Sequence, residues 1–194
     1  MTPKQFSILA KELFGSTLGQ CGFSSEKSSH AVFYRSVGDG VWHIISADQG
    51  TRGAWYDVKV FATCECLEPE FEDRFPDEIG IPMDASCYLS MRGITVAQEQ
   101  FNCKSEENFR SRYEKSVESL LVDKAIPYLD RIGSLESMLP FIRNPFYEAV
   151  AICKIQGIDH AKGLLLRQKE LLQGAPADDV VKAATRLLDS LLAS

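Results

Sequence analysis

Apolar residues near the start of the chain recur every three or four positions, the spacing of one helix face. This apolar stripe consists of Phe6, Leu9, Leu13, Phe14, Leu18 and Cys21. The dipeptide Thr2-Pro3 supplies a hydroxyl N-cap and a proline at the first helical position. Gly22 is a typical residue just beyond a helix end. The pattern predicts an N-terminal helix that ends before Gly22.

Four runs of strand-forming residues follow this helix. Residues 31–37 and 41–47 are rich in β-branched and aromatic side chains, and the turn Gly38-Asp39-Gly40 between them predicts a hairpin. Residues 54–66 alternate between an apolar face and a wetter face that carries Asp57 and Thr63, and residues 87–96 form a fourth run. Because no helix separates the runs, we expect a four-stranded antiparallel meander.

The rest of the chain has the pattern of a helical half. Helix-start residues precede amphipathic runs at five places: Ser105, Ser134, Asn144, Asp159 and Pro176. We therefore expect an α+β fold in which an N-terminal helix precedes the sheet and the C-terminal helices pack on one sheet face. Residues 1–132 form the α+β domain, and residues 133–194 form a helical extension of the same structural unit.

Composition and charge narrow the classes of function. The chain has 194 residues, a net charge of −6 and a pI near 5.2, so it repels phosphate backbones and we expect no nucleic-acid partner. It has no run of the roughly 20 apolar residues needed to span a bilayer and no secretory signal pattern. Its six cysteines are spread without a disulfide framework. These features predict a soluble cytoplasmic protein that does not bind membranes.

Acidic residues concentrate in the segment EPEFEDRFPDE, residues 68–78. The segment holds six acids against one base, Arg74; the acids are Glu68, Glu70, Glu72, Asp73, Asp77 and Glu78. Such a patch attracts a basic partner, and inhibitors of nucleases often use one for this purpose. The interleaved Phe71 and Phe75 are candidate anchors. The alternative is a solvated loop whose phenylalanines pack back on the sheet.

One polar constellation in the predicted sheet has the residue types of general acid–base chemistry. Arg35, His43 and Asp57 lie on three successive strands and are weak catalytic candidates. The alternative is cross-strand pairing on a solvated face. Cys64-Glu65-Cys66 lacks the spacing and the second ligand pair of a zinc site, so we expect structural cysteines. No phosphate loop, dinucleotide fingerprint or nucleophile elbow occurs, and we expect no metal and no cofactor.

A further pattern is shared with a known family. The predicted helix ends in Gly22-Phe23, the first strand carries Phe33-Tyr34-Arg35, and the second runs from Ile44-Ile45 to Gln49. Over residues 2–132 this order resembles the bacterial family catalogued as domain of unknown function 4304. The resemblance implies a small α+β domain with an N-terminal helix on an antiparallel sheet. That family has no assigned activity, so the resemblance transfers no catalytic residues.

Three hypotheses of function follow from these patterns. The first is a non-catalytic binding protein, such as an immunity-like inhibitor that engages a basic protein through residues 65–78. The second is a hydrolase or a small-ligand protein that uses Arg35, His43 and Asp57 beside a pocket between sheet and helices. The third is a homodimer, formed through an edge strand or the tail helices, that carries out no chemistry.

Overall fold

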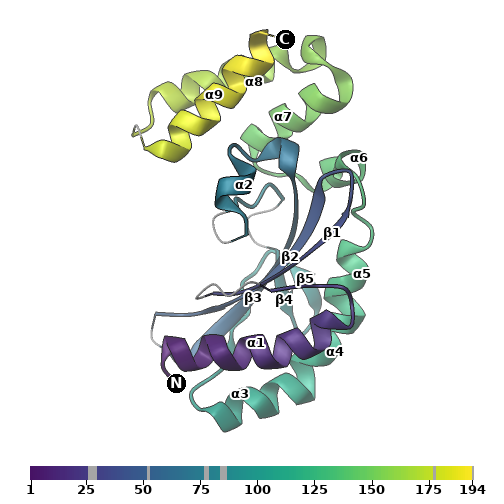
Figure 1. Ribbon diagram of the computed structural model, residues 1–194, viewed down its shortest axis with the longest axis vertical. Helices are drawn as coiled ribbons and strands as arrows, with labels where there is room; N and C mark the ends of the chain where they lie inside the picture. The colour runs from purple at the N-terminus through teal and green to yellow at the C-terminus, as the bar shows by residue number, and fades with distance from the viewer. Residues whose placement is uncertain (26–29, 52, 77–78, 84–86, 177, 194) are drawn as a thin grey trace.

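The protein is an α+β structure in which an N-terminal helix and a helical C-terminal half flank an antiparallel sheet (Figure 1). The computed structural model describes residues 1–25, 30–51, 53–76, 79–83, 87–176 and 178–193. None of the helices in these ranges is both long and apolar enough to cross a membrane. The predicted fold class is confirmed, and the predicted strand count is not.

The first helix, α1 (Pro3–Gly19), begins and ends where the sequence predicts. The Thr2 hydroxyl accepts from the backbone N–H of Gln5, and the Gln5 side chain accepts from the backbone N–H of Thr2. This capping box satisfies two N–H groups that would otherwise lack partners. The apolar stripe then directs Phe6, Phe14 and Leu18 into the core, where each is at least 97% buried.

In the part of the chain that the structure describes, the sheet has six strands rather than four, and all of them are paired antiparallel. The order is β1-β2-β3-β4-β5, and β6 pairs separately with β3. The strands are β1 (Ala31–Gly38), β2 (Val41–Gln49), β3 (Trp55–Cys64), β4 (Tyr88–Ser90), β5 (Gly93–Thr95) and β6 (Phe101–Asn102).

The extra strands arise because the expected fourth strand, residues 87–96, folds back on itself. Gly93 has a φ of 112°, a conformation that favours glycine. The Ser90 hydroxyl donates to the Gly93 carbonyl at 2.9 Å and accepts from the Arg92 N–H. These contacts divide the run into β4 and β5. β6 adds two further residues that pair with Trp55 and Tyr56 at the start of β3.

The pairing register gives the sheet two distinct faces. Phe33 pairs with Ile45, and Ile45 pairs with Val60, so these residues share the face toward α1. On that face Tyr56 contacts the rings of Phe6 and Phe109 at centroid distances of 5.4 and 5.0 Å. An aromatic core between sheet and helices therefore closes this side.

The opposite face is less exposed than the sequence pattern predicts. Asp57, Phe61 and Thr63 point to this face, yet all three are buried. The described residues of the segment 65–83 fold back beside it: Pro76, Ile79 and Ile81 lie next to Phe61 and Ile44. This segment includes η1 (Glu65–Leu67) and α2 (Phe71–Arg74). A long-range connection thus covers positions that a local alternation assigns to solvent.

The C-terminal helices divide into two groups. One continuous helical run lies on the same side of the sheet as α1; it comprises α3 (Glu106–Arg112), η2 (Tyr113–Val117), α4 (Glu118–Leu120), η3 (Leu121–Ala125) and α5 (Ile126–Leu129). The second group lies at the far end of the molecule from α1 (Figure 1). It comprises α6 (Leu135–Met138), η4 (Leu139–Phe141), α7 (Pro145–Gln156), α8 (Ile158–Gln173) and α9 (Asp179–Ala193). Only the first group covers the sheet face as expected, because α7 packs against η1 instead.

Candidate functional site: an acidic and aromatic groove beside α2

The candidate acid–base residues are separated by the sheet. Arg35 and His43 are cross-strand partners on the face toward the helices, whereas Asp57 points to the opposite face. Asp57 accepts a hydrogen bond from the Gln98 amide, and burial raises the pKa of its carboxyl. The structure therefore brings two of the three candidates together and leaves the third outside their cluster.

The polar groups of Arg35 and His43 are occupied by partners within the fold. Arg35 Nε donates to His43 Nδ1 at 3.2 Å, and His43 Nε2 lies 2.6 Å from the Ile132 carbonyl oxygen. Nδ1 is thus the acceptor and Nε2 carries the proton. Arg35 also donates to the Cys21 carbonyl and forms an ion pair with Asp130. Because neither ring nitrogen is open to a substrate, this arrangement is that of a structural network rather than of a general base.

The electrostatics of His43 agree with that interpretation. His43 is 99% buried, and burial, opposed by the bond to Ile132 and assisted by the Arg35 charge, lowers the pKa of its ring below 6.5. The imidazole is therefore neutral at pH 7. Neutral His43 can accept from Arg35, which a charged imidazolium cannot do.

The predicted acidic segment folds into short turns that sort its carboxylates into buried and exposed groups. Glu68 is 96% buried, and its Oε2 accepts from Arg74 Nη1 at 3.2 Å. Burial nevertheless raises the pKa of Glu68, against the opposing effects of Tyr147 and Arg74. Glu70 pairs with Arg186 of α9 at 3.0 Å. Two further predicted partner-binding acids of this stretch, Asp77 and Glu78, lie outside the described residues.

Two acids of α2 remain available to a partner. Glu72 and Asp73 are exposed, and neither forms an ion pair with any residue that the structure describes. Both lie in the single turn of α2, whose chain enters through Glu70 in the left-handed conformation at a φ of 55°. Their charges are therefore held at the surface by the backbone of this turn.

The phenylalanines of the segment both pack on the sheet and stay partly exposed. Phe75 lies 4.6 Å from the Trp42 ring and 4.8 Å from the Tyr34 ring, measured between centroids. Phe71 stacks on Phe75 at 4.9 Å. Phe71 and Phe75 are each half-buried. They form an aromatic cluster on the sheet face opposite α1.

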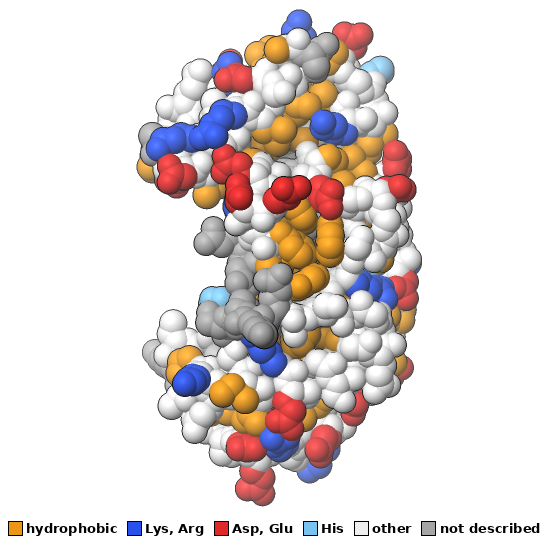
Figure 2. All heavy atoms as spheres, viewed as in Figure 1, with side chains coloured by type: hydrophobic (Ala, Val, Ile, Leu, Met, Phe, Trp, Pro, Cys, Tyr) orange, Lys and Arg blue, Asp and Glu red, His pale blue; other side chains and the backbone are white. Residues whose placement is uncertain are grey.

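The carboxylates and the aromatic cluster together line one groove of about 630 Å³. Its walls are Trp42, Phe71 and Phe75 with the five acids Glu65, Glu68, Glu70, Glu72 and Asp73. In the described part of the chain, no lysine or arginine lines this acidic–aromatic groove. Figure 2 shows acidic side chains gathered beside hydrophobic ones in the region of α2.

One residue of the groove, Trp42, lies outside the segment 65–78 that the sequence suggests as partner-binding. Trp42 Nε1 donates to Glu65 Oε1 at 2.9 Å, which fixes the indole edge and the carboxylate relative to each other. Trp42 lies two residues after the hairpin turn, on the strand face opposite His43. Strand alternation alone could have identified this position, since Trp42 and Tyr34 share the face toward the acidic segment.

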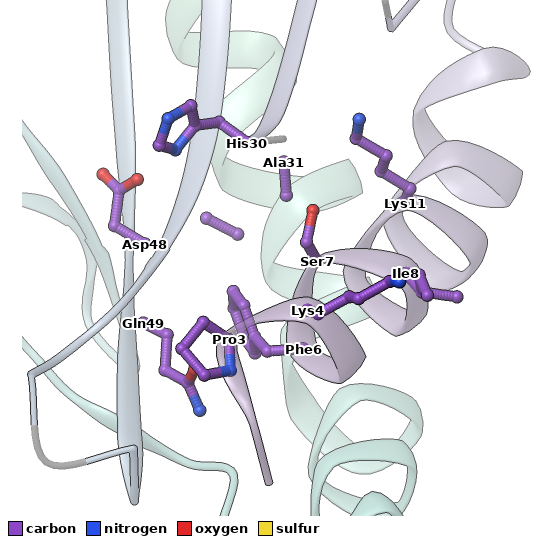
Figure 3. Close-up of a pocket in the computed structure, with 11 residues that line it drawn as sticks. Pro3, Lys4, Phe6, Ser7, Ile8, Lys11, His30, Ala31, Asp48 and Gln49 are labelled. Carbon is purple, nitrogen blue, oxygen red and sulfur yellow. The ribbon is translucent and has the colours of Figure 1, made fainter. Parts of the chain in front are cut away.

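A second cavity, of about 720 Å³, lies between α1 and the ends of β1 and β2 (Figure 3). Its apolar wall includes Phe6, Ile8 and Ala31, and Lys4 and Lys11 of α1 stand at its edge. In Figure 3 the side chains of His30 and Asp48 point toward one another across the other side. This volume falls in the range of small-molecule sites.

The described residues do not form a metal centre. No group of three or more histidine, cysteine, aspartate or glutamate side chains in these parts of the chain has the arrangement needed to hold a metal ion.

Comparison of the chain with protein-family models, with curated proteins and with solved structures gives no match. The resemblance to the family of unknown function 4304 stays a prediction, and no function is transferred from a relative.

Proposed function

We propose that the protein is a non-catalytic binding protein that captures a basic protein partner in the acidic–aromatic groove, as an immunity-like inhibitor would. The observation that carries this proposal is the composition of the groove. Carboxylates rim it, half-buried aromatic rings form its floor, and the described residues that line it include no cation.

The charges of the groove favour a cationic ligand even after internal pairing. Arg74 and Arg186 pair with Glu68 and Glu70, whereas the carboxylates of Glu65, Glu72 and Asp73 form no ion pair with another described residue. A concentrated negative patch steers a basic partner and raises its association rate. Since Glu72 and Asp73 are exposed, salt screens them over a Debye length of about 8–10 Å.

The aromatic floor adds selectivity for arginine. A guanidinium can lie over an indole or phenyl face while it donates to a neighbouring carboxylate. Trp42 and Glu65 present such a pair, since the carboxylate is fixed to the indole edge at 2.9 Å. Phe71 extends the ring surface. We expect an arginine side chain of the partner to be the central anchor.

A labelled peptide of alternating arginine and leucine tests the groove directly. Fluorescence anisotropy should show binding that weakens as salt rises and that is stronger than binding of the lysine analogue. In the double variant Glu72→Lys, Asp73→Lys the affinity should fall at least about tenfold, which corresponds to about 1.4 kcal/mol. Trp42→Phe should reduce the preference for arginine over lysine.

A matched control carries the same charge change on the other side of the sheet. Glu114 and Asp123 are exposed on the helical run that packs with α1, so Glu114→Lys, Asp123→Lys should bind the peptide nearly as the wild type does. Equal loss in both double variants would mean that net charge, rather than the groove, governs binding. The proposal would be refuted if the arginine peptide did not bind the wild type, or if Glu72→Lys, Asp73→Lys bound it with unchanged affinity.

The cavity beside α1 favours a second candidate function, the binding of a small anionic molecule with an apolar body. Its wall is apolar, and Lys4 and Lys11 supply positive charge. Among the described residues that line it, the one acid, Asp48, already pairs with Lys59 at 2.8 Å. An anion entering from the side of α1 therefore meets two lysines and a neutralised carboxylate.

Anilinonaphthalene sulfonate, an aromatic anion, is a suitable probe of that cavity. Its fluorescence should rise when the folded wild type is added, and the rise should be at least halved for the variant Lys4→Glu, Lys11→Glu. The control Lys162→Glu, Arg167→Glu changes two exposed cations of α8. Equal signals from the two variants at unchanged circular dichroism would exclude the cavity as an anion site.

A further inference from the structure

The sulfur atoms of Cys64 and Cys66 lie 3.3 Å apart. All six cysteines are among the described residues and all are free thiols. A disulfide requires an S–S separation of about 2.05 Å, so closure requires these two sulfurs to approach by only about 1.2 Å. The pair is therefore positioned for a bond that the structure does not contain.

The local fold explains why the two sulfurs meet. In an extended strand, residues i and i+2 lie on one face but are separated by more than about 6 Å, because each residue rises about 3.3 Å. Cys64 is the last residue of β3 and has extended backbone angles, whereas Glu65–Leu67 forms the tight turn η1. This turn brings Cys66 back toward Cys64. Two cysteines whose spacing is typical of one strand face are thereby brought close enough to form a dithiol pair.

A surface cavity gives reagents access to the pair. The cavity has a volume of about 420 Å³, and Cys64, Cys66, Gly40, Leu135 and Glu136 are among its lining residues. Cys64 is buried and Cys66 is half-buried. A small oxidant can reach the sulfurs there without unfolding of the sheet.

The two thiols are electronically different. The hydrogen bond from Cys66, which outweighs the effect of burial, lowers the pKa of Cys64 to about 7. The same bond, together with burial, raises the pKa of Cys66. At neutral pH Cys64 is therefore the more readily ionised thiol of the two, and Cys66 is placed to attack second.

From the sulfur separation, the turn and the cavity, we propose that Cys64 and Cys66 form a reversible intramolecular disulfide in response to a small hydroperoxide. The Cys64 thiolate attacks one peroxide oxygen, the O–O bond breaks, and the departing hydroxide takes a proton to become water. The product is Cys64 sulfenic acid.

The Cys66 sulfur then attacks the Cys64 sulfur and gives up its proton. The S–O bond breaks, and the leaving hydroxide takes that proton to form a second water. In sum, two thiols and one hydrogen peroxide yield one disulfide and two waters, a two-electron oxidation. A small thiol reverses the change by thiol–disulfide exchange.

Peptide mass spectrometry tests the proposal on the full chain. Cleavage after Lys59 and Arg74 gives a peptide, residues 60–74, that contains only these two cysteines. After stoichiometric hydrogen peroxide and blocking with N-ethylmaleimide, we expect this peptide to lose two hydrogens and to take up no maleimide. Dithiothreitol should restore double labelling, and the other four cysteines should label throughout.

Single variants separate the two roles. Cys66→Ser should stop at Cys64 sulfenic acid, which dimedone traps, whereas Cys64→Ser or Cys64→Ala should leave Cys66 reduced at the same dose. Cys21→Ser, a change at a half-buried cysteine away from the pair, should form the disulfide as the wild type does. A peptide that keeps both thiols, or that is oxidised directly to sulfinic acid, would overturn the proposal. So would equal oxidation of Cys66 with and without Cys64.

Discussion

The buried network of His43 makes the stability of the protein depend on pH, and this dependence can be predicted in sign and size. Burial lowers the pKa of the folded His43 ring below 6.5. As the pH falls below about 6.5, the His43 ring binds a proton in the unfolded chain but stays neutral in the folded state. Stability from this group is therefore fully present above 6.5 and is lost as the pH falls toward the folded pKa.

The expected loss is up to about 1.4 kcal/mol for each pH unit within that window. For a chain of this length it corresponds to a fall of roughly 3–6 °C in Tm for each unit. His43→Gln keeps an acceptor toward Arg35 and a donor toward Ile132 but does not titrate. Urea and thermal unfolding at pH 7.5 and 5.5 should show the loss in the wild type and a much smaller loss in this variant.

His160→Gln is the matched control, because His160 is exposed on α8. It should retain the pH dependence of the wild type. If His43→Gln also retained that dependence, the neutral, fully bonded state of His43 would be wrong, and the ring would again be a candidate base. The measurement thus decides between a structural and a catalytic role for this histidine.

Three further stability predictions follow from buried polar groups. The Tyr56 hydroxyl is buried with no hydrogen-bond partner among the described residues, whereas the Tyr113 hydroxyl donates to Thr17 at 2.8 Å. In urea unfolding, Tyr56→Phe should therefore stabilise the protein and Tyr113→Phe should destabilise it, each by about 1 kcal/mol. A change of stability in the same direction for both variants would contradict this. Burial raises the pKa of Asp57 in the folded protein, so the stability that this group contributes falls as the pH rises from 3.8 toward the folded pKa. Asp57→Asn should abolish that fall, and at pH 7 the variant should be at least as stable as the wild type in urea unfolding. A Cβ at Gly80 would overlap the Tyr147 hydroxyl, so Gly80→Ala should lower stability by about 1–3 kcal/mol, and an unchanged Tm would refute this close approach.

The features that the sequence predicts well are those set by local rules. The capping box of α1 needs only Thr2 and Gln5, and the β1–β2 hairpin follows from its turn residues and the strand propensity on each side. The register that places Arg35 opposite His43 needs one further feature, a bulge between Ser36 and Gly38 that shifts the pairing by one residue relative to the turn. Such contacts are close in sequence, so residue type and spacing determine them.

The features that the sequence does not predict depend on distant segments. Asp130, 95 residues beyond Arg35, supplies the ion pair that completes the network, and no spacing rule connects these positions. Likewise, the alternation in β3 assigns Asp57 and Thr63 to a solvated face, yet both are buried, and the partner of Asp57, Gln98, lies 41 residues further along the chain. The acidic composition of the segment 68–78 favours a solvated loop, although Glu68 is buried within it.

The connection between β3 and β4 therefore has two physical roles that different side chains carry. Phe75 and Pro76 cover the sheet face opposite α1, so they contribute to stability as well as to the groove. Glu72 and Asp73 touch no charged partner among the described residues and can change without loss of packing. The helix-facing side is closed by aromatic packing and by the Arg35 network. The exposed carboxylates of this connection can therefore be changed to test the proposed binding without a change in the packing of the core. For this reason, variants of Glu72 and Asp73 test the proposed binding alone, whereas variants of Phe75 change both the proposed binding and the stability.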